Sequence, residues 1–338
     1  MWLSLGLGIG LWILTALITW IWIRVALSRQ IHDGPERRRL HDTFIPRAGG
    51  IGIAIVMLAS CGVIFFTAAH RSPLWLVLIA AMSFFSVLGF YDDLKPIGAG
   101  RKLSLHLLAT SAIWLFGSSL LSLDFVTAAV VALTYLAMVN IWNFMDGSNG
   151  MIGMQSLLMV AGFMLLSSFS VPTYYYALAL AVSCLAFLPF NFPVARVFLG
   201  DVGSHVLGAA VFGLAILAYT ENQWSVLEIA CLFSVLWLDA VLTFIRRAMR
   251  GFKVMDAHRS HLYQYAIRNG RSHARVCGIY AIWTIIAIFV IGLSRHLPEA
   301  VQSIVLTGHL LVGAATHQWF RLFVLKSTRN PEFRKSEA

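Results

Sequence analysis

Long apolar stretches alternate with short polar segments along the whole chain. Eleven of these stretches predict helices that span a lipid bilayer, because each supplies close to the roughly 20 apolar residues that a spanning helix needs. They lie at residues 2–23, 49–69, 73–91, 103–123, 125–142, 151–171, 172–190, 203–220, 225–245, 277–294 and 298–320. An odd number of spans places the two ends of the chain on opposite sides of the membrane.

The composition supports lipid as the solvent of this chain. Hydrophobic residues make up 59% of the sequence and charged residues 12%, with a mean hydropathy of +0.78, far from the values of an ordinary soluble domain. We therefore expect an all-α polytopic integral membrane protein with a single transmembrane domain over residues 1–323 and a short basic tail over 324–338. The four cysteines stand singly in or beside apolar stretches, so we expect small core residues and neither disulfides nor a zinc site.

The cations are unevenly distributed between the two predicted faces. If the loops are assigned alternately, twenty-three of the 25 Lys and Arg residues fall on one face, and only Arg71 and Arg295 fall on the other. Cytoplasmic loops carry such an excess, which predicts an N-terminus outside and a C-terminus in the cytoplasm. The net charge of +10 would then meet anionic lipids and phosphorylated substrates, and no nucleic acid is needed to explain it.

Five polar segments fall on this cytoplasmic face, and their common location predicts one shared site. The first covers residues 32–50 and contains His41; it is either an ordinary positively charged loop or a cationic wall for phosphates. The second holds the adjacent carboxylates Asp92 and Asp93, followed by Lys102 at the start of the next span. Neighbouring carboxylates at a membrane surface repel each other, so they usually need a cation or a role in proton transfer.

The third and fourth segments combine amide and carboxylate oxygens with glycines. The third contains Asn143, Asp146 and Asn149, and it is either an oxygen-rich binding turn or a set of common turn residues. The fourth runs from Asn191 to a Gly-Asp-x-Gly-Ser sequence around Asp201. This sequence is either a helix cap or a site where the carboxylate holds a divalent metal beside backbone N–H groups that face phosphate oxygens.

The fifth segment contains His258 and His261, three positions apart, with Arg259 between them. Two histidines at this spacing can share a helical face. They lack a convincing third zinc ligand, so the sequence favours binding of a diphosphate over a zinc site.

Taken together, the five segments resemble the polyprenyl-phosphate N-acetylhexosamine-1-phosphate transferases, glycosyltransferase family 4. The resemblance covers about residues 33–264. The matching elements are Asp33-x-Pro-x-Arg with His41 and Gly49-Gly50, Asp92-Asp93 followed by Arg101-Lys102, Asn143-x-x-Asp146-Gly, Asn191 with Phe198-Leu199-Gly200-Asp201-x-Gly-Ser204, and the histidine cluster after a basic helix end.

This resemblance implies transfer of a sugar 1-phosphate from a UDP-sugar to undecaprenyl phosphate, with release of UMP, in the bacterial inner membrane with a periplasmic N-terminus. It implies Mg²⁺, with Mn²⁺ as an alternative, on Asp201. Lys102, Arg259 and the histidines would offset the remaining negative charge, and Asp92 or Asp93 would deprotonate or position the lipid phosphate. Asn191 and Phe198 would hold the uridine, and the resemblance is compatible with a homodimer.

Two departures from the family's sequence pattern bear on the identity of the donor sugar. Where Asp-Gly-x-Asp-Gly is common in the family, this chain has Asn149 in place of the second carboxylate. The histidine cluster resembles the branch that starts O-antigen, and hence lipopolysaccharide, with N-acetylated 6-deoxyhexosamines. The donor sugar is therefore expected to be FucNAc, QuiNAc or GlcNAc, and the absence of a triple-histidine pattern argues against peptidoglycan precursor transfer.

Two other functions are compatible with the residues alone. A transporter of an anionic lipid or sugar phosphate would use the acids as proton relays, but such proteins commonly place their sites near the midplane between internal repeats. A phosphatase would need water as the acceptor. Three further polar residues lie within spans: Asp239 is expected to support the site, Glu228 to reach water, and His106 to be packed or hydrogen-bonded.

Overall fold

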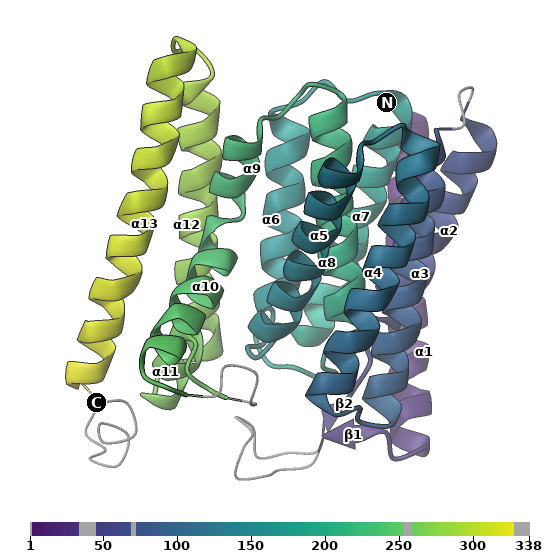
Figure 1. Cartoon of the computed structure of the whole chain (residues 1–338). Helices are drawn as coiled ribbons and strands as arrows, with labels where there is room; N and C mark the ends of the chain where they lie inside the picture. The colour runs from purple at the N-terminus through teal and green to yellow at the C-terminus, as the bar shows by residue number, and fades with distance from the viewer. Residues whose placement is uncertain (1, 34–44, 69–71, 253–257, 328–338) are drawn as a thin grey trace. The chain divides into compact units, whose positions relative to one another are not determined.

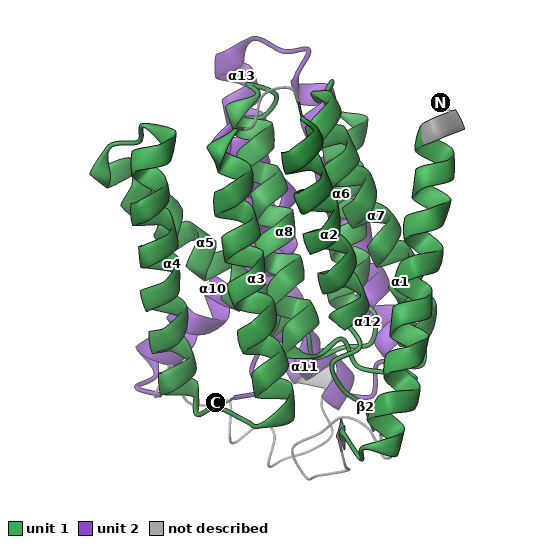
Figure 2. Cartoon of the chain, turned by 90° about the vertical axis from the view of Figure 1, so that its right-hand side faces the viewer, with its two compact units in different colours: residues 1–224 green, residues 225–338 purple. Residues whose placement is uncertain are grey.

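The computed structural model describes residues 2–33, 45–68, 72–252 and 258–327 (Figure 1). The chain divides into two compact units, Met1–Trp224 and Ser225–Ala338, which Figure 2 shows in different colours. His41 and the tail beyond residue 327 lie outside the described residues. The single domain over residues 1–323 stays a prediction.

Among the described residues, the first unit contains eight helices and one very short antiparallel strand pair, in which β1 pairs with β2. Its elements are α1 (Trp2–Ser28), β1 (His32–Asp33), β2 (Ile45–Pro46), α2 (Ile51–Thr67), α3 (Pro73–Leu94), α4 (Ala99–Leu121), α5 (Phe125–Met145), α6 (Met151–Leu165), α7 (Val171–Asn191) and α8 (Gly200–Thr220). The all-α class predicted from the hydropathy pattern is confirmed.

Helix α8 forms the centre of the first unit. It packs against α2, α3, α5, α6 and α7, and it is buried along most of its length. Its sequence is rich in glycine and alanine, and such small residues let neighbouring helix backbones approach closely in a membrane. The N-terminal end of this central helix carries Asp201.

The second unit contains α9 (Val226–Leu232), α10 (Ser234–Met249), α11 (Leu262–Arg268), α12 (His273–Ser294) and α13 (Glu299–Ser327). The single unbroken helix predicted over 225–245 is wrong, because α9 and α10 meet at Phe233 with a bend of 81°. That the bent pair crosses the membrane as one span stays a prediction. The indole Nε1 of Trp237 donates to the Ala230 carbonyl oxygen at 2.8 Å and so satisfies one backbone acceptor near the break. The prediction that Glu228 reaches water is also wrong. Its side chain is buried, and its Oε1 pairs with Arg295 Nε at 2.7 Å.

Each of the eleven predicted apolar stretches overlaps a helix or, for 225–245, the α9–α10 pair. Within the described residues, seven helices are long and apolar enough to cross a membrane, or eight if the bent pair is one span. Helices α2 and α6 are apolar but shorter. A multi-pass membrane protein is therefore supported, while the count of eleven spans stays a prediction.

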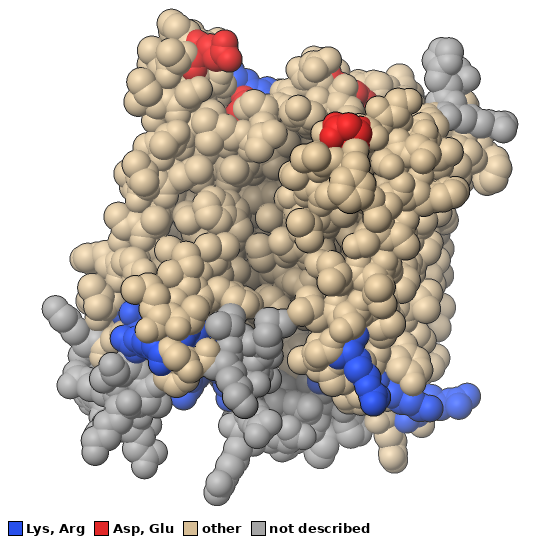
Figure 3. All heavy atoms as spheres, in the orientation of Figure 1, with Lys and Arg blue, Asp and Glu red and all other residues tan. Residues whose placement is uncertain are grey.

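Charged side chains are segregated along the helices. On the face drawn in Figure 3, most visible Lys and Arg side chains of each unit lie at one end of its helices, and most visible Asp and Glu side chains lie at the other. This segregation agrees with the uneven loop charges in the sequence. The cytoplasmic orientation of the cationic end stays a prediction.

Candidate functional site

Four helix ends of the first unit bring the predicted acidic and amide residues together. Asp92 and Asp93 lie in the last turn of α3, and Lys102 lies in the first turn of α4. Asn143 lies near the end of α5, and Asp201 lies in the first turn of α8. Residues that are up to 109 positions apart in the chain therefore share one set of hydrogen bonds.

Lys102 connects two of the carboxylates. Its Nζ lies 2.8 Å from Asp92 Oδ2, and it also forms an ion pair with Asp201 Oδ2. The Lys102 side chain is only 15% exposed, so water screens these charges weakly. The ammonium group therefore offsets the repulsion between the two acids.

Asn143 fixes the other oxygen of Asp201. Its Nδ2 donates to Asp201 Oδ1 at 2.9 Å and to Ser204 Oγ at 3.1 Å. Ser204 ends the matching Phe-Leu-Gly-Asp-x-Gly-Ser element, but no role was assigned to it from the sequence. Its position three residues after Asp201, on the same face of a helix, is the signal that would have indicated a shared role with Asp201.

Asp93 caps the helix that carries Asp201. Its Oδ1 accepts the backbone N–H of Asp201 and its Oδ2 accepts that of Val202, both at 3.0 Å. A carboxylate at this position satisfies N–H groups that have no partner within the helix and interacts favourably with the helix dipole. Asp92 has a different environment, since its Oδ1 accepts the N–H of Ile97 and its Oδ2 faces Lys102.

Two glycines permit this close approach of α3 and α8. Gly200 has φ +75°, a left-handed conformation, and a Cβ there would lie 2.5 Å from Asp93 Oδ2. A Cβ on Gly89 would lie 2.5 Å from the backbone oxygen of Asp201. The glycine of the Phe-Leu-Gly-Asp sequence is therefore required by both backbone conformation and space.

The donor chemistry around Asp201 fits a magnesium ion. Burial, together with the negative charges of Asp201 and Asp93, raises the pKa of Asp146 well above its usual range. A divalent cation bound beside these acids would favour their ionised forms and so offset the cost of their burial and repulsion. The described residues contain no group of three His, Cys, Asp or Glu ligands, but Mg²⁺ needs only one or two protein carboxylates when waters and substrate phosphates complete its shell.

The amide of Asn191 connects two turns beside this site. Its Oδ1 accepts the Gly150 N–H at 2.7 Å, and its Nδ2 donates to the Val197 carbonyl at 2.9 Å. Asn149 Nδ2 donates to the Pro193 carbonyl at 3.3 Å. Asn191 therefore has a clear structural role, and its predicted contact with uridine stays a prediction.

The partly buried Phe198 lies next to the end of the first polar segment. Its backbone N–H donates to the Pro46 carbonyl at 2.8 Å, and its carbonyl accepts the Gly49 N–H at 2.9 Å. These bonds attach the chain after β2 to the turn that precedes α8. The stacking of Phe198 on uridine stays a prediction.

Two buried histidines lie one helical turn beyond the charged pair. His106 follows Lys102 by four residues and His205 follows Asp201 by four, and their ring centroids are 4.8 Å apart. His106 is fully buried, with Nδ1 3.3 Å from Asn140 Oδ1, which confirms the prediction of a packed, hydrogen-bonded histidine. His205 was not predicted from the sequence, although its i, i+4 spacing from Asp201 is a signal that would have indicated it.

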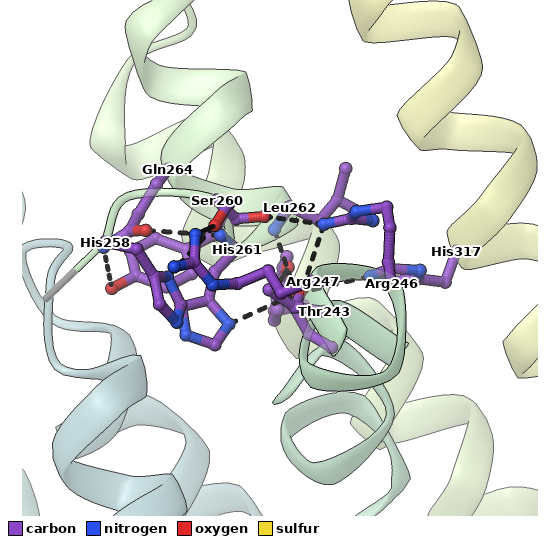
Figure 4. A network of polar contacts seen from close by, with 12 residues as sticks. Thr243, Arg246, Arg247, His258, Ser260, His261, Leu262, Gln264 and His317 are labelled. Carbon is purple, nitrogen blue, oxygen red and sulfur yellow. Dashed lines mark hydrogen bonds and ion pairs between the residues drawn. The ribbon is translucent and has the colours of Figure 1, made fainter. Parts of the chain in front are cut away.

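The fifth polar segment, His258–Leu262, is called the histidine segment below, and it belongs to the second unit (Figure 4). Ser260 Oγ lies 3.1 Å from His258 Nδ1, and Arg247 Nη1 donates to the same oxygen at 3.2 Å. Burial, His261 and the arginines Arg247 and Arg246 lower the pKa of His258 to about 4, so its imidazole is neutral near pH 7. Arg259 and His261 belong to this segment, and a site shared with the first unit stays a prediction.

Comparison with known proteins gives the family. The sequence profile described as Glycosyl transferase family 4 matches residues 74–219, which include Asp92, Asp93, Lys102, Asn143 and Asp201. The histidine segment lies outside the matched region.

Several curated bacterial proteins are similar over most of this chain. The decaprenyl-phosphate N-acetylglucosaminephosphotransferase of Mycobacterium tuberculosis (strain H37Rv) is 26% identical, over 83% of this chain and 80% of that protein. A probable undecaprenyl-phosphate N-acetylglucosaminyl 1-phosphate transferase of Bacillus subtilis is 29% identical, over 82% and 81%. A phospho-N-acetylmuramoyl-pentapeptide-transferase of Moorella thermoacetica is 30% identical, over 67% and 78%. The chain belongs to glycosyl transferase family 4.

Proposed function

We propose that this protein transfers a sugar 1-phosphate from a UDP-sugar to undecaprenyl phosphate in the bacterial inner membrane. The observation that carries the proposal is the hydrogen-bonded group of Asp92, Lys102, Asn143 and Asp201 at the helix ends of a family 4 chain. The names of the relatives support a polyprenyl-phosphate acceptor and a hexosamine 1-phosphate group.

In the proposed reaction, an oxygen of the lipid phosphate attacks the β-phosphorus of the UDP-sugar. The bond from that phosphorus to the bridging oxygen breaks, UMP leaves, and the lipid carries the sugar on a diphosphate. Both reactants are anions, so the protein must above all neutralise charge and align the phosphates. Magnesium held by Asp201 supplies a Lewis acid for the diphosphate oxygens when bound.

In this proposal, Lys102 neutralises charge beside Asp201, and Asn143 orients the Asp201 carboxylate. The Lys102 ammonium sits between Asp92 and Asp201, where it offsets negative charge before and during transfer. Asn143 holds the orientation of the Asp201 carboxylate by a hydrogen bond of 2.9 Å. An oriented carboxylate needs no rearrangement when the phosphates arrive, and such preorganisation lowers the barrier.

The two adjacent acids take different roles in this proposal. Both oxygens of Asp93 accept backbone N–H groups of α8, so we assign Asp93 to the positioning of Asp201. Asp92 uses Oδ2 to contact Lys102, and we assign it to accepting the proton of the lipid phosphate or to orienting that phosphate. The lipid phosphate attacks directly, without a covalent phosphosugar on either aspartate.

The donor carries an N-acetylated hexosamine or 6-deoxyhexosamine, and its product starts a cell-surface polysaccharide such as O-antigen. The relatives named for N-acetylglucosamine support UDP-GlcNAc, and the His258-Arg259-Ser260-His261 sequence favours the 6-deoxy sugars. His258, Arg259 and His261 bind the donor diphosphate.

The decisive experiment measures UMP release by the purified full-length protein in detergent. The reaction contains Mg²⁺, undecaprenyl phosphate and one donor at a time: UDP-GlcNAc, UDP-FucNAc or UDP-QuiNAc. We expect release that requires both lipid and metal. The donor with the highest kcat/KM identifies the sugar.

A matched pair of variants makes this experiment specific. Asp201→Asn should lower kcat by about 100-fold or more, since several kcal/mol of charge stabilisation are lost and each 1.36 kcal/mol is tenfold in rate. Asp124→Asn is the control, because the Asp124 carboxylate caps α5 by accepting the Thr127 N–H at 3.0 Å and the Thr127 hydroxyl at 2.5 Å, both exposed and local, and asparagine is as good an N-cap as aspartate. Equal activity of the two variants, or UMP release without lipid, would contradict the proposal.

A further inference from the structure

Asp239 is a buried carboxylate that receives hydrogen bonds from several elements of the second unit. It lies in α10 and is 1% exposed. Its Oδ1 accepts the Leu262 N–H at 2.9 Å, and its Oδ2 accepts the Tyr280 hydroxyl at 2.6 Å. His317 Nε2, on α13, lies 3.3 Å from Oδ1. A buried charge requires such partners, because its loss of hydration is otherwise expensive.

These partners connect the C-terminal helices to the histidine segment. Leu262 is the first residue of α11 and directly follows His261, so the bond from its N–H fixes the backbone where the segment ends. His261 Nδ1 lies 3.7 Å from Asp239 Oδ1, an electrostatic contact that is longer than a hydrogen bond. Tyr280 and His317 do not contact this segment through any of these bonds; they act on it by holding Asp239.

A second set of bonds holds the preceding residue of the segment. Arg246 Nη2, one helical turn after Thr243, donates to the Ser260 carbonyl at 2.9 Å, and Thr243 Oγ1 donates to Asp239 Oδ1 at 3.3 Å (Figure 4). One face of α10 therefore fixes the chain on both sides of His261. Side chains that must meet a diphosphate gain from such fixing, because rotamers and backbone held in advance need not be ordered on binding.

We propose that Asp239 is a positioning residue which, held by Tyr280 and His317, fixes the His258–Leu262 segment for binding of the donor diphosphate. This makes α12 and α13, which lie outside the matched region 74–219, part of the binding apparatus. The inference rests on the proposed function for the identity of the ligand.

Two variants test this positioning role. Tyr280→Phe removes only the hydroxyl that donates to Asp239, and Asp239→Asn removes the charge while keeping the shape. Tyr176→Phe is the matched control, because its buried hydroxyl donates to the Ala210 carbonyl at 2.8 Å within the first unit. Hydrogen exchange of the peptide covering residues 258–264 and the kinetics of UMP release are measured for all three full-length variants.

We expect the exchange of the Leu262 amide to rise by about tenfold in Asp239→Asn, the factor that corresponds to a weakened hydrogen bond to a charged group. A smaller rise is expected in Tyr280→Phe and none in Tyr176→Phe. KM for the donor should increase in both test variants, by about three- to tenfold, with a smaller change in kcat, since the chemistry occurs at other residues. In a His261→Ala background, Tyr280→Phe should raise KM by a smaller factor than it does in the wild-type protein, since only His258 and Arg259 then remain to be positioned.

Unchanged exchange in both test variants would overturn the proposal, as would an additive effect in the His261→Ala background. Raised exchange with unchanged KM would overturn it too, because the bonds would then serve stability alone. If the wild-type protein releases no UMP with any donor, the proposed function fails while the exchange measurement still decides whether Asp239 fixes the segment. His317→Gln offers a further check, since its amide can donate to Asp239 and should preserve the wild-type KM better than His317→Leu.

Discussion

Asp93 holds the first turn of the helix that carries Asp201: its two carboxylate oxygens accept the N–H groups of Asp201 and Val202, each at 3.0 Å. The backbone of one predicted site residue is thus fixed by the side chain of another. Asp92, the immediate neighbour of Asp93, instead contacts Lys102 at 2.8 Å. Two adjacent acids therefore have distinct structural roles.

This difference predicts distinct effects of Asp93→Asn and Asp92→Asn. Asp93→Asn should lower the free energy of unfolding by about 1–2 kcal/mol, because an amide replaces one acceptor by a donor and removes a favourable charge at a helix N-terminus. Asp92→Asn should change stability less and reduce kcat by about 100-fold or more, in the range that general acid–base catalysis contributes. Thermal unfolding and UMP release by the same preparations check both expectations; an Asp93→Asn protein of wild-type stability would contradict the cap.

Gly89→Ala should destabilise the first unit. The added methyl group would lie 2.5 Å from the backbone oxygen of Asp201, and backbone atoms cannot move aside as a flexible side chain can. We expect a loss of about 1–3 kcal/mol, typical of overpacking. Gly62→Ala in α2 is the control, because a Cβ there meets no atom within 4 Å and alanine favours a helix; a loss of stability equal in the two variants would contradict the close approach of α3 to α8.

Asn191→Ala should act through stability more than through affinity for the donor. The substitution leaves the Gly150 N–H and the Val197 carbonyl without their side-chain partner, at a cost of about 1–3 kcal/mol for each buried group left unsatisfied. Thermal unfolding and KM for the UDP-sugar separate the two effects. A raised KM with an unchanged unfolding temperature would instead favour direct contact between Asn191 and uridine.

His258 should titrate at unusually low pH in the ligand-free protein. Burial, His261 and nearby arginines lower its pKa to about 4, from the ordinary histidine value of 6.5. As pH falls below 6.5, the unfolded chain takes up this proton first, so the contribution of His258 to stability is complete above pH 6.5 and is lost as pH falls towards 4. Proton NMR of the histidine rings, with the signal assigned by its loss in His258→Gln, measures the midpoint; a value near 6.5 would contradict the lowered pKa.

The helices and the candidate site residues could be predicted from the sequence, because the length of an apolar stretch and the position of a motif are local properties of the chain. The helices and the meeting of Asp92, Lys102, Asn143 and Asp201 at the helix ends followed from where polar segments interrupt apolar ones. The break at Phe233 was not predictable in this way, because Val226–Met249 contains neither proline nor glycine, the residues that most often mark a sharp bend in a helix.

Hydrogen bonds between residues that are distant in the sequence also could not be predicted. The cap that Asp93 gives to α8 and the bond between Tyr280 and Asp239 join helices far apart in the chain. Neither partner lies at a spacing that local helical geometry could reveal. The sequence indicated the candidate site residues, whereas their hydrogen-bond partners could be identified only from the fold.

Because of the 81° bend at Phe233, the directions in which the side chains of α10 point do not follow from those of α9. In one continuous helix, inserting or deleting a residue in α9 would rotate every later side chain by about 100°. Here the capping bonds between Ser225 and Glu228 set the start of α9, while the bonds of Asp239 set the rotation of α10. The apolar surface of α9 can therefore vary in length without turning Asp239 away from the chain that it holds.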